Sequence, residues 1–209
     1  MFKSHLKFNK KQYETNAIIY NLCLTAIFLA MIIVCRFISK YLNFINGYSL
    51  QLQYLPLILG LMIIPIFRYR FLLYLISPIL LLSFGFSSNP IFDYLFTSWS
   101  LWPFLLIRTN WNDSNLVYSS IKIFILFLIS FIQMWWWNSL SGVLFFQVDW
   151  NYSFVFNAIF NGINFAFLYV FIIYLGYFIF GFQIDNWKLQ KMTGNNQACQ
   201  IKLIHEKLN

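Results

Sequence analysis

Long apolar segments alternate with short polar ones along almost the whole chain. Polar, basic stretches occupy residues 1–16 and 183–209, and the apolar segments lie between them. Apolar runs of about 20 residues are typical of transmembrane helices rather than of strands or a soluble core. We therefore predict an all-α integral membrane protein with a single transmembrane domain over residues 17–182. Its six predicted helices cover about residues 17–38, 50–67, 71–84, 91–107, 118–146 and 154–182.

The predicted helix over residues 118–146 is longer than one membrane crossing requires. At about 1.5 Å per residue it would extend roughly 44 Å, whereas the hydrocarbon core is about 30 Å thick. Such a helix must tilt, protrude or break. We predict a break near Asn138–Gly142, where polar and small residues interrupt the apolar run.

Composition and charge agree with the membrane assignment. The chain is 60% hydrophobic and 10% charged, whereas soluble domains carry about 25% charged residues. The net charge of +8 does not indicate a nucleic-acid partner, because the basic residues fall between apolar segments. Eleven of the fourteen Lys and Arg lie on the side that holds both termini. Since Lys and Arg are enriched in cytoplasmic segments, we predict that both termini are inside.

The sequence carries no recognisable catalytic or metal-binding set. Its two histidines, His5 and His205, lie in the polar ends, and no phosphate-binding GxxxxGK[ST] loop is present. The cysteines Cys23, Cys35 and Cys199 do not form a metal-binding or disulfide pattern. We therefore favour binding or transport over catalysis, and we expect no metal or cofactor.

Unusual residues, most of them polar, gather at one predicted depth near the outer surface, within the apolar segments or at their ends. They are Tyr48, Asp93, Tyr94, Asn138, Ser141, Gly142, Asn157, Asn161 and Asn164. The last three are four and three residues apart, which places them on one helix face. Polar side chains in a bilayer need partners or a ligand. This clustering predicts a small-ligand pocket, and nearby aromatic residues would suit a flat or cationic ligand.

Simpler interpretations of the same residues stay open. Asp93 is also compatible with an interfacial carboxylate that reaches water. The three-Asn face is also compatible with hydrogen bonding between helices alone. The run Trp135–Trp137 is also typical of an aromatic belt at the membrane interface.

Three segments in the first half of the chain resemble the substrate-binding S components of energy-coupling factor (ECF) vitamin transporters, above all the thiamine-specific branch. LTAIFLAMIIV is similar to the family's helix of regularly spaced small residues, with Ala26 and Ala30 at those positions. In GYSLQLQYLPLIL, Tyr48 stands where the family has a ligand-contacting Trp. FDYLFTSWSLWPFLLIR resembles the family's acid-Tyr-Leu helix start, with Asp93 in place of Glu and Tyr94 kept.

Two segments in the second half extend the resemblance over most of the chain. WWWNSLSGVLFF is similar to a family run in which Asn138 replaces a His, Gly142 is kept and Phe146 replaces a Trp. FNAIFNG looks like the family's Tyr-x4-Asn-Gly, with Phe156 in place of the Tyr and Asn161 kept.

The resemblance implies a bundle of six membrane helices in the bacterial plasma membrane that captures thiamine or a close relative from outside. It also implies delivery through a membrane coupling subunit, contacted by Ala26 and Ala30, and two ATPases. The expected site residues have distinct chemistries. Asp93 would neutralise or accept hydrogen bonds from a cationic or amino-bearing ring, with Tyr94 beside it. Tyr48, Phe146 and Phe156 would stack, Asn138 and Asn161 would hydrogen-bond the ligand, and Gly142 would let it approach the backbone.

Three alternatives to thiamine capture remain. The same scaffold could bind another vitamin or a pyrimidine precursor. The chain could instead be a non-transporting membrane scaffold protein whose Asn face only joins helices. An intramembrane enzyme is the least favoured, because no nucleophile–base pair or metal set is visible in the sequence.

Overall fold

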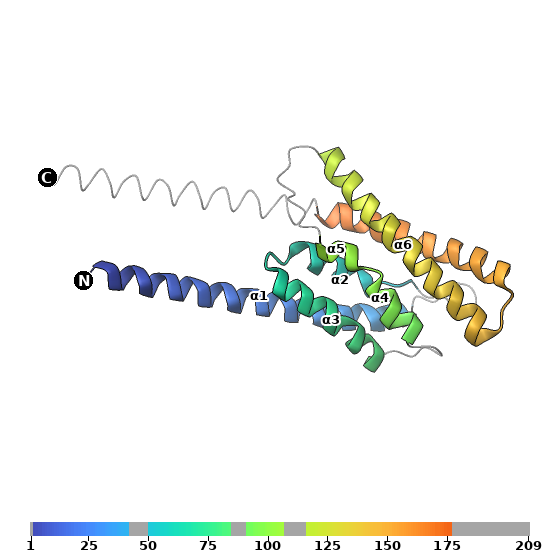
Figure 1. The fold of residues 1–209 in the computed structure, drawn as a ribbon, viewed down its shortest axis with the longest axis horizontal. Coiled ribbons are helices and arrows are strands. Elements are labelled where there is room, and N and C mark those ends of the chain that lie inside the picture. Colours follow the sequence, from blue (N-terminus) through green and yellow to red (C-terminus); the bar gives the residue numbers. More distant parts are fainter. Residues whose placement is uncertain (1, 42–49, 85–90, 107–115, 177–209) are drawn as a thin grey trace.

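The computed structural model describes residues 2–41, 50–84, 91–106 and 116–176, and all regular secondary structure in these ranges is helical (Figure 1). Tyr48, the tail 183–209 and the predicted end of the last helix after residue 176 lie outside the described residues. The all-α class predicted from the sequence is confirmed for the described part.

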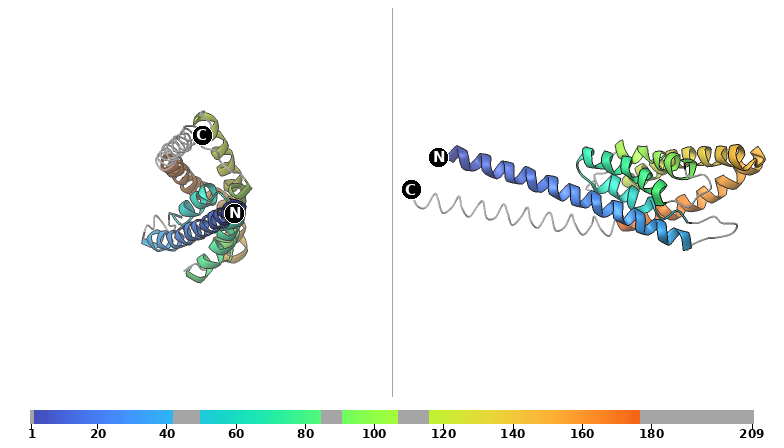
Figure 2. Two further views of the ribbon diagram at one scale, coloured as in Figure 1. Left: turned by 90° about the vertical axis from the view of Figure 1, so that its left-hand side faces the viewer. Right: turned by 90° about the horizontal axis from the view of Figure 1, so that it is seen from below.

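Four helices are long and apolar enough to cross a membrane, as expected for a multi-pass membrane protein. Their spanning parts are Thr15–Tyr41 of α1 (Phe2–Tyr41), all of α3 (Phe67–Phe84), Ser120–Phe146 of α6 (Leu116–Phe146), and a final helix, Trp150–Gly176. The final helix carries no label in Figure 1 and is called the 150–176 helix. α1 begins within the predicted polar N-terminus and projects beyond the other described helices (Figure 2).

The segment predicted as a helix over residues 50–67 forms only α2, Tyr54–Ile63. Its 10 residues are too few to cross a bilayer. The helix stops because Ile64 precedes Pro65 and adopts an extended backbone, with φ −63° and ψ 118°. Most of α2 is buried, so this apolar segment forms a core helix between α1 and α3.

The segment predicted as one helix over residues 91–107 forms three short pieces. They are the π-helical turn η2 (Ile91–Phe96), α4 (Thr97–Trp99) and α5 (Trp102–Leu106). Pro103 explains the interruption, because it has no N–H to donate to the carbonyl of Trp99 four residues earlier. The Tyr74 hydroxyl donates to that carbonyl instead, at 2.8 Å. A side chain of α3 thus satisfies the backbone group that the proline frees.

The break predicted near Asn138–Gly142 is wrong, because α6 continues without interruption to Phe146. The chain leaves the helix at the next residue, Gln147, which has a φ of 53°. The Asp149 carboxylate then caps the 150–176 helix by accepting from the N–H groups of Asn151 and Tyr152, at 3.0 and 3.2 Å. The tight turn at residues 147–149 therefore lies between the predicted helices over 118–146 and 154–182, and it joins two antiparallel helices.

The described elements form two groups with the short pieces between them. α1, α2 and α3 pack together in one group. α6 and the 150–176 helix form the other group, an antiparallel pair that we call the hairpin. η2, α4 and α5 lie between α3 and α6 (Figure 1). Fully buried side chains of α2 fill the centre of the first group, among them Tyr54, Leu57, Ile58 and Leu61. The short pieces therefore connect the two groups of long helices.

Small residues set the close approach within the hairpin. A Cβ added at Gly142 would overlap the hydroxyl oxygen of Ser153. That hydroxyl is held in place, since it donates to the Ser139 carbonyl at 2.9 Å and accepts from the Asn157 amide at 3.3 Å. At Gly162, in contrast, the nearest atom to an added Cβ is 4.0 Å away, on Phe131.

We expect Gly142→Ala to be less stable than Gly162→Ala by about 1–3 kcal/mol, the usual cost of overpacking. Both substitutions replace a helical glycine by alanine and gain the same helix propensity. The difference between their free energies of unfolding therefore reports the overlap with Ser153. Thermal unfolding of the two variants in the same detergent measures it. Equal stability of the two variants would show that the hairpin opens to accommodate the methyl group at no cost.

Candidate functional site

A polar network joins α4, α6 and the 150–176 helix in the interior. The Asn138 side-chain amide donates to the Asn161 carbonyl oxygen at 3.1 Å. The Thr97 hydroxyl donates to the main-chain oxygen of Phe92 at 2.8 Å and lies 3.5 Å from the Asn138 carbonyl oxygen. Asn138 and Asn161 were predicted at the same depth, and the structure brings them into direct contact.

Asn161 is the member of this network with unused hydrogen-bonding capacity. Its side chain is 3% exposed, and its amide nitrogen has no hydrogen-bond partner among the described residues. A buried donor without a partner costs about 1–3 kcal/mol. A ligand that presents an acceptor to this nitrogen would recover that free energy, so the Asn161 amide is the strongest candidate for a ligand contact.

The other two members of the predicted Asn face have structural partners. Asn164 accepts a hydrogen bond from the main-chain N–H of Gln51 at 3.0 Å, and so holds the segment that leads into α2. Asn157 donates to the carbonyl of Ser153 in its own helix at 2.9 Å. Structural hydrogen bonds therefore account for Asn157 and Asn164. They leave the amide nitrogen of Asn161 without a partner among the described residues.

Asp93 and Tyr94 lie on η2, close to α1 and α2. The Tyr54 hydroxyl of α2 donates to the main-chain oxygen of Asp93 at 3.0 Å, which fixes the π-helical turn. π-helical turns are frequent at functional sites. Tyr94 is buried, and its hydroxyl accepts a hydrogen bond from the Arg36 guanidinium of α1.

Arg36 is a site residue that the sequence reasoning missed. In the charge count it is one of the three Lys and Arg outside the group of eleven, and it was considered only as a signal of topology. Its guanidinium carbon lies 4.7 Å from the centroid of the Tyr94 ring, within cation–π range. The available signal was an arginine inside an apolar segment, which is by default a functional candidate.

The two phenylalanines predicted to stack on a ligand lie in different surroundings. Phe146 is at the end of α6, and 53% of its side chain is exposed. Phe156 stacks on Tyr152 and packs against Phe160, with ring centroids 5.5 and 4.5 Å apart, all within the 150–176 helix. Their ligand-stacking role stays a prediction.

Gly142 is in the hairpin contact with Ser153, where its lack of a side chain admits the neighbouring helix. Its predicted role, the approach of a ligand to the backbone, stays a prediction. Among the described residues, no group of three or more His, Cys, Asp or Glu is placed to hold a metal ion.

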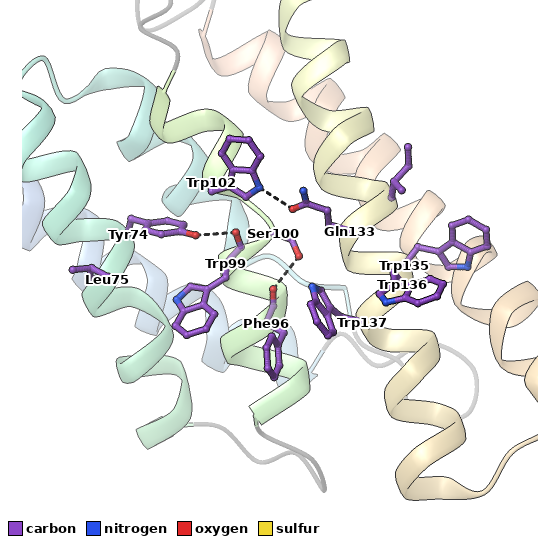
Figure 3. A pocket seen from close by; sticks show the side chains of 11 residues that line it. Tyr74, Leu75, Phe96, Trp99, Ser100, Trp102, Gln133, Trp135, Trp136 and Trp137 are labelled. Carbon is purple, nitrogen blue, oxygen red and sulfur yellow. Dashed lines mark hydrogen bonds between the residues drawn. The ribbon is translucent and has the colours of Figure 1, made fainter.

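A separate, aromatic cleft of about 700 Å³ lies between α6 and the elements α3, α4 and α5 (Figure 3). We call it the tryptophan cleft; its lining residues are Tyr74, Leu75, Phe96, Trp99, Ser100, Trp102, Ile132, Gln133, Trp135, Trp136 and Trp137. Trp137 stacks on Phe96 with centroids 4.5 Å apart. The Trp135 indole instead donates to the Phe154 carbonyl of the 150–176 helix at 2.7 Å. The sequence interpretation of these tryptophans as an interfacial belt did not reveal this cleft.

These features define an all-helical protein of the multi-pass membrane type, with a polar network buried between its helices. Comparison with protein-family models, curated proteins and solved structures gives no match to the chain.

Proposed function

We propose that this chain is the substrate-capture subunit of an ECF-type importer in the bacterial plasma membrane. Both of its termini would lie inside, and its ligand would be thiamine or a close relative taken from outside. The observation that carries the proposal is the buried Asn161 amide nitrogen, which has no hydrogen-bond partner among the described residues. A structural asparagine would ordinarily have its buried polar atoms paired.

The chemistry of thiamine suits this network. Its aminopyrimidine ring carries nitrogen acceptors and an amino donor, and its thiazolium ring is cationic. The Asn161 amide nitrogen would donate to a ring nitrogen, while Asn138 holds Asn161 in place through the 3.1 Å hydrogen bond. Asp93, on a turn fixed by Tyr54, would neutralise the cationic ring. The cost of desolvating the Asp93 carboxylate is then offset by the bound cation.

The exposed face of α1 supports the proposed partner. Ala26 and Ala30 are both exposed, one turn apart, and they lie within the spanning part of α1. Small residues at this spacing let a second helix approach closely in a membrane. In the proposal, the coupling subunit docks on these two alanines and two ATPases drive release of the vitamin inward.

We expect thiamine to quench the tryptophan fluorescence of the purified protein at micromolar concentrations. Five of the eight tryptophans line the cleft beside α4 and α6, the elements that carry Thr97 and Asn138. Repacking of these elements around a ligand would therefore change their emission. Titration across a panel of vitamins and pyrimidine precursors measures the response. A response to another member of the panel would replace thiamine, and a response to none would contradict vitamin capture altogether.

A scaffold role without transport is the second candidate. It is favoured by the hydrogen bond between Asn138 and Asn161, which would join α6 to the 150–176 helix even without a ligand. Under that hypothesis, Asn161→Leu and Asp93→Asn change assembly and leave ligand uptake unaffected.

A further inference from the structure

The tryptophan cleft is bounded at two ends by contacts between α6 and the short helices. At one end the Trp102 indole donates to the Gln133 side-chain oxygen at 3.0 Å. At the other end the Phe96 and Trp137 rings stack (Figure 3). Gln133 and Trp137 are four residues apart, which is about 6 Å along a helix. The two contacts therefore lie about one helical turn apart along α6.

The mouth of the cleft faces the surroundings of the membrane helices. Its rim includes Leu75 on α3 and Ile132 on α6, which are 40% and 51% exposed. Both helices are long and apolar enough to cross a membrane. Exposed apolar side chains at the middle of such helices contact lipid, so the cleft opens onto hydrocarbon rather than water.

The lining selects an apolar occupant. No charged residue is among the described residues that line the cleft. Both hydroxyl groups in the lining already have partners: the Tyr74 hydroxyl donates to the Trp99 carbonyl at 2.8 Å, and the Ser100 hydroxyl donates to the Phe96 carbonyl at 2.9 Å. A polar vitamin would lose its hydration there and gain few hydrogen bonds. A hydrocarbon chain would gain dispersion contacts with the aromatic walls.

We propose that the tryptophan cleft is a binding site for one acyl chain of a bilayer phospholipid. The cleft volume of about 700 Å³ is within the roughly 300–1,000 Å³ of small-molecule sites. The mostly aromatic and aliphatic lining, with exposed Leu75 and Ile132 at its edge, suits an acyl chain. Phe96 in its wall is next to Thr97, whose hydroxyl contacts Asn138, so the bound chain would also brace α4 against α6 beside the polar network.

The test uses the full chain in phosphatidylcholine vesicles in which a rising fraction of the lipid carries bromine on its acyl chains. Bromine quenches tryptophan on contact, and five of the eight tryptophans line the cleft. We expect the quenching to have two components. One saturates at a low fraction of brominated lipid, and the other increases in proportion to that fraction. The saturating component reports a bound chain, and the proportional one reports surrounding lipid.

Ile132→Phe and Leu75→Phe would each fill the mouth of the cleft from its exposed rim, and we expect them to reduce the saturating component at least threefold. Ile121→Phe is the matched control, because Ile121 and Ile132 are both 51% exposed on α6 but only Ile132 lines the cleft. The control should keep the saturating component.

Three results would overturn the proposal. They are quenching proportional to the brominated fraction throughout, a saturating component that both rim variants retain, and acrylamide quenching of the same emission that the saturating component removes. A dependence of the saturating component on protein density in the vesicle would indicate a second copy instead. Vitamin binding is measured separately, so failure here leaves the proposed function intact, and the reverse also holds.

Discussion

Replacement of Asn161 by leucine is expected to weaken ligand binding by roughly 5- to 150-fold. The substitution removes the buried amide nitrogen that has no hydrogen-bond partner among the described residues, and with it the proposed donor to the ligand. It also leaves the Asn138 amide without the acceptor that it has at 3.1 Å. Loss of one partner of a buried hydrogen bond costs about 1–3 kcal/mol, and each 1.4 kcal/mol is tenfold in affinity.

The measurement is the dissociation constant of the responding vitamin, from tryptophan quenching, for the wild type, Asn161→Leu and Asn151→Leu. Asn151 is an exposed residue of the same helix whose main-chain N–H, not its side chain, binds Asp149. Circular dichroism confirms that each variant keeps its helix content. An unchanged dissociation constant in Asn161→Leu, with altered assembly, would contradict vitamin binding at this network and support the scaffold hypothesis.

Ala30→Trp is expected to abolish vitamin uptake while leaving vitamin binding unchanged. A tryptophan at this position would keep a partner helix from approaching α1, because small residues permit that approach. A clash of only about 1.4 kcal/mol would weaken the complex with the coupling subunit tenfold. Ala30 is exposed on α1, so the substitution does not disturb the interior. Uptake of radiolabelled thiamine by cells and binding to the purified chain are compared directly.

Met31→Trp is the matched control for this prediction. Met31 is also exposed on α1 but lies about 100° around the helix from Ala30. It should retain uptake if the coupling subunit docks on Ala26 and Ala30. Equal loss of uptake in both variants would indicate a general effect of a bulky residue on α1, and full uptake in Ala30→Trp would exclude this face as the docking surface.

The long helices were predictable, whereas the shorter elements were not. Hydropathy located the spanning part of α1 (Thr15–Tyr41), α6 and the start of the 150–176 helix to within a few residues. It did not indicate that α1 begins already at Phe2. It also indicated full helices over 50–67 and 91–107, which the structure replaces with α2 and with three short pieces. An apolar side chain has the same hydropathy whether it faces lipid or a protein core, so the pattern alone does not separate a spanning helix from a buried one.

The site was predictable in part. The common depth of Asn138 and Asn161 followed from topology and helix periodicity, and the structure brings the pair into contact. Arg36 was missed because its position at the end of a helix looked like a topology signal. Its contact with Tyr94 depends on how α1 packs against η2, which local sequence does not specify.

The sequence by itself determined the class of this protein. Its long apolar runs make membrane helices the form in which every backbone group is paired within hydrocarbon. Only the tertiary structure decided which polar atoms stay unpaired and where a cleft opens. Asn161 keeps a free amide nitrogen because Asn138 occupies only its oxygen. The tryptophan cleft lies between α6 and the elements α3, α4 and α5, which the chain brings together from separate segments. Both features depend on the three-dimensional placement of residues far apart in the chain.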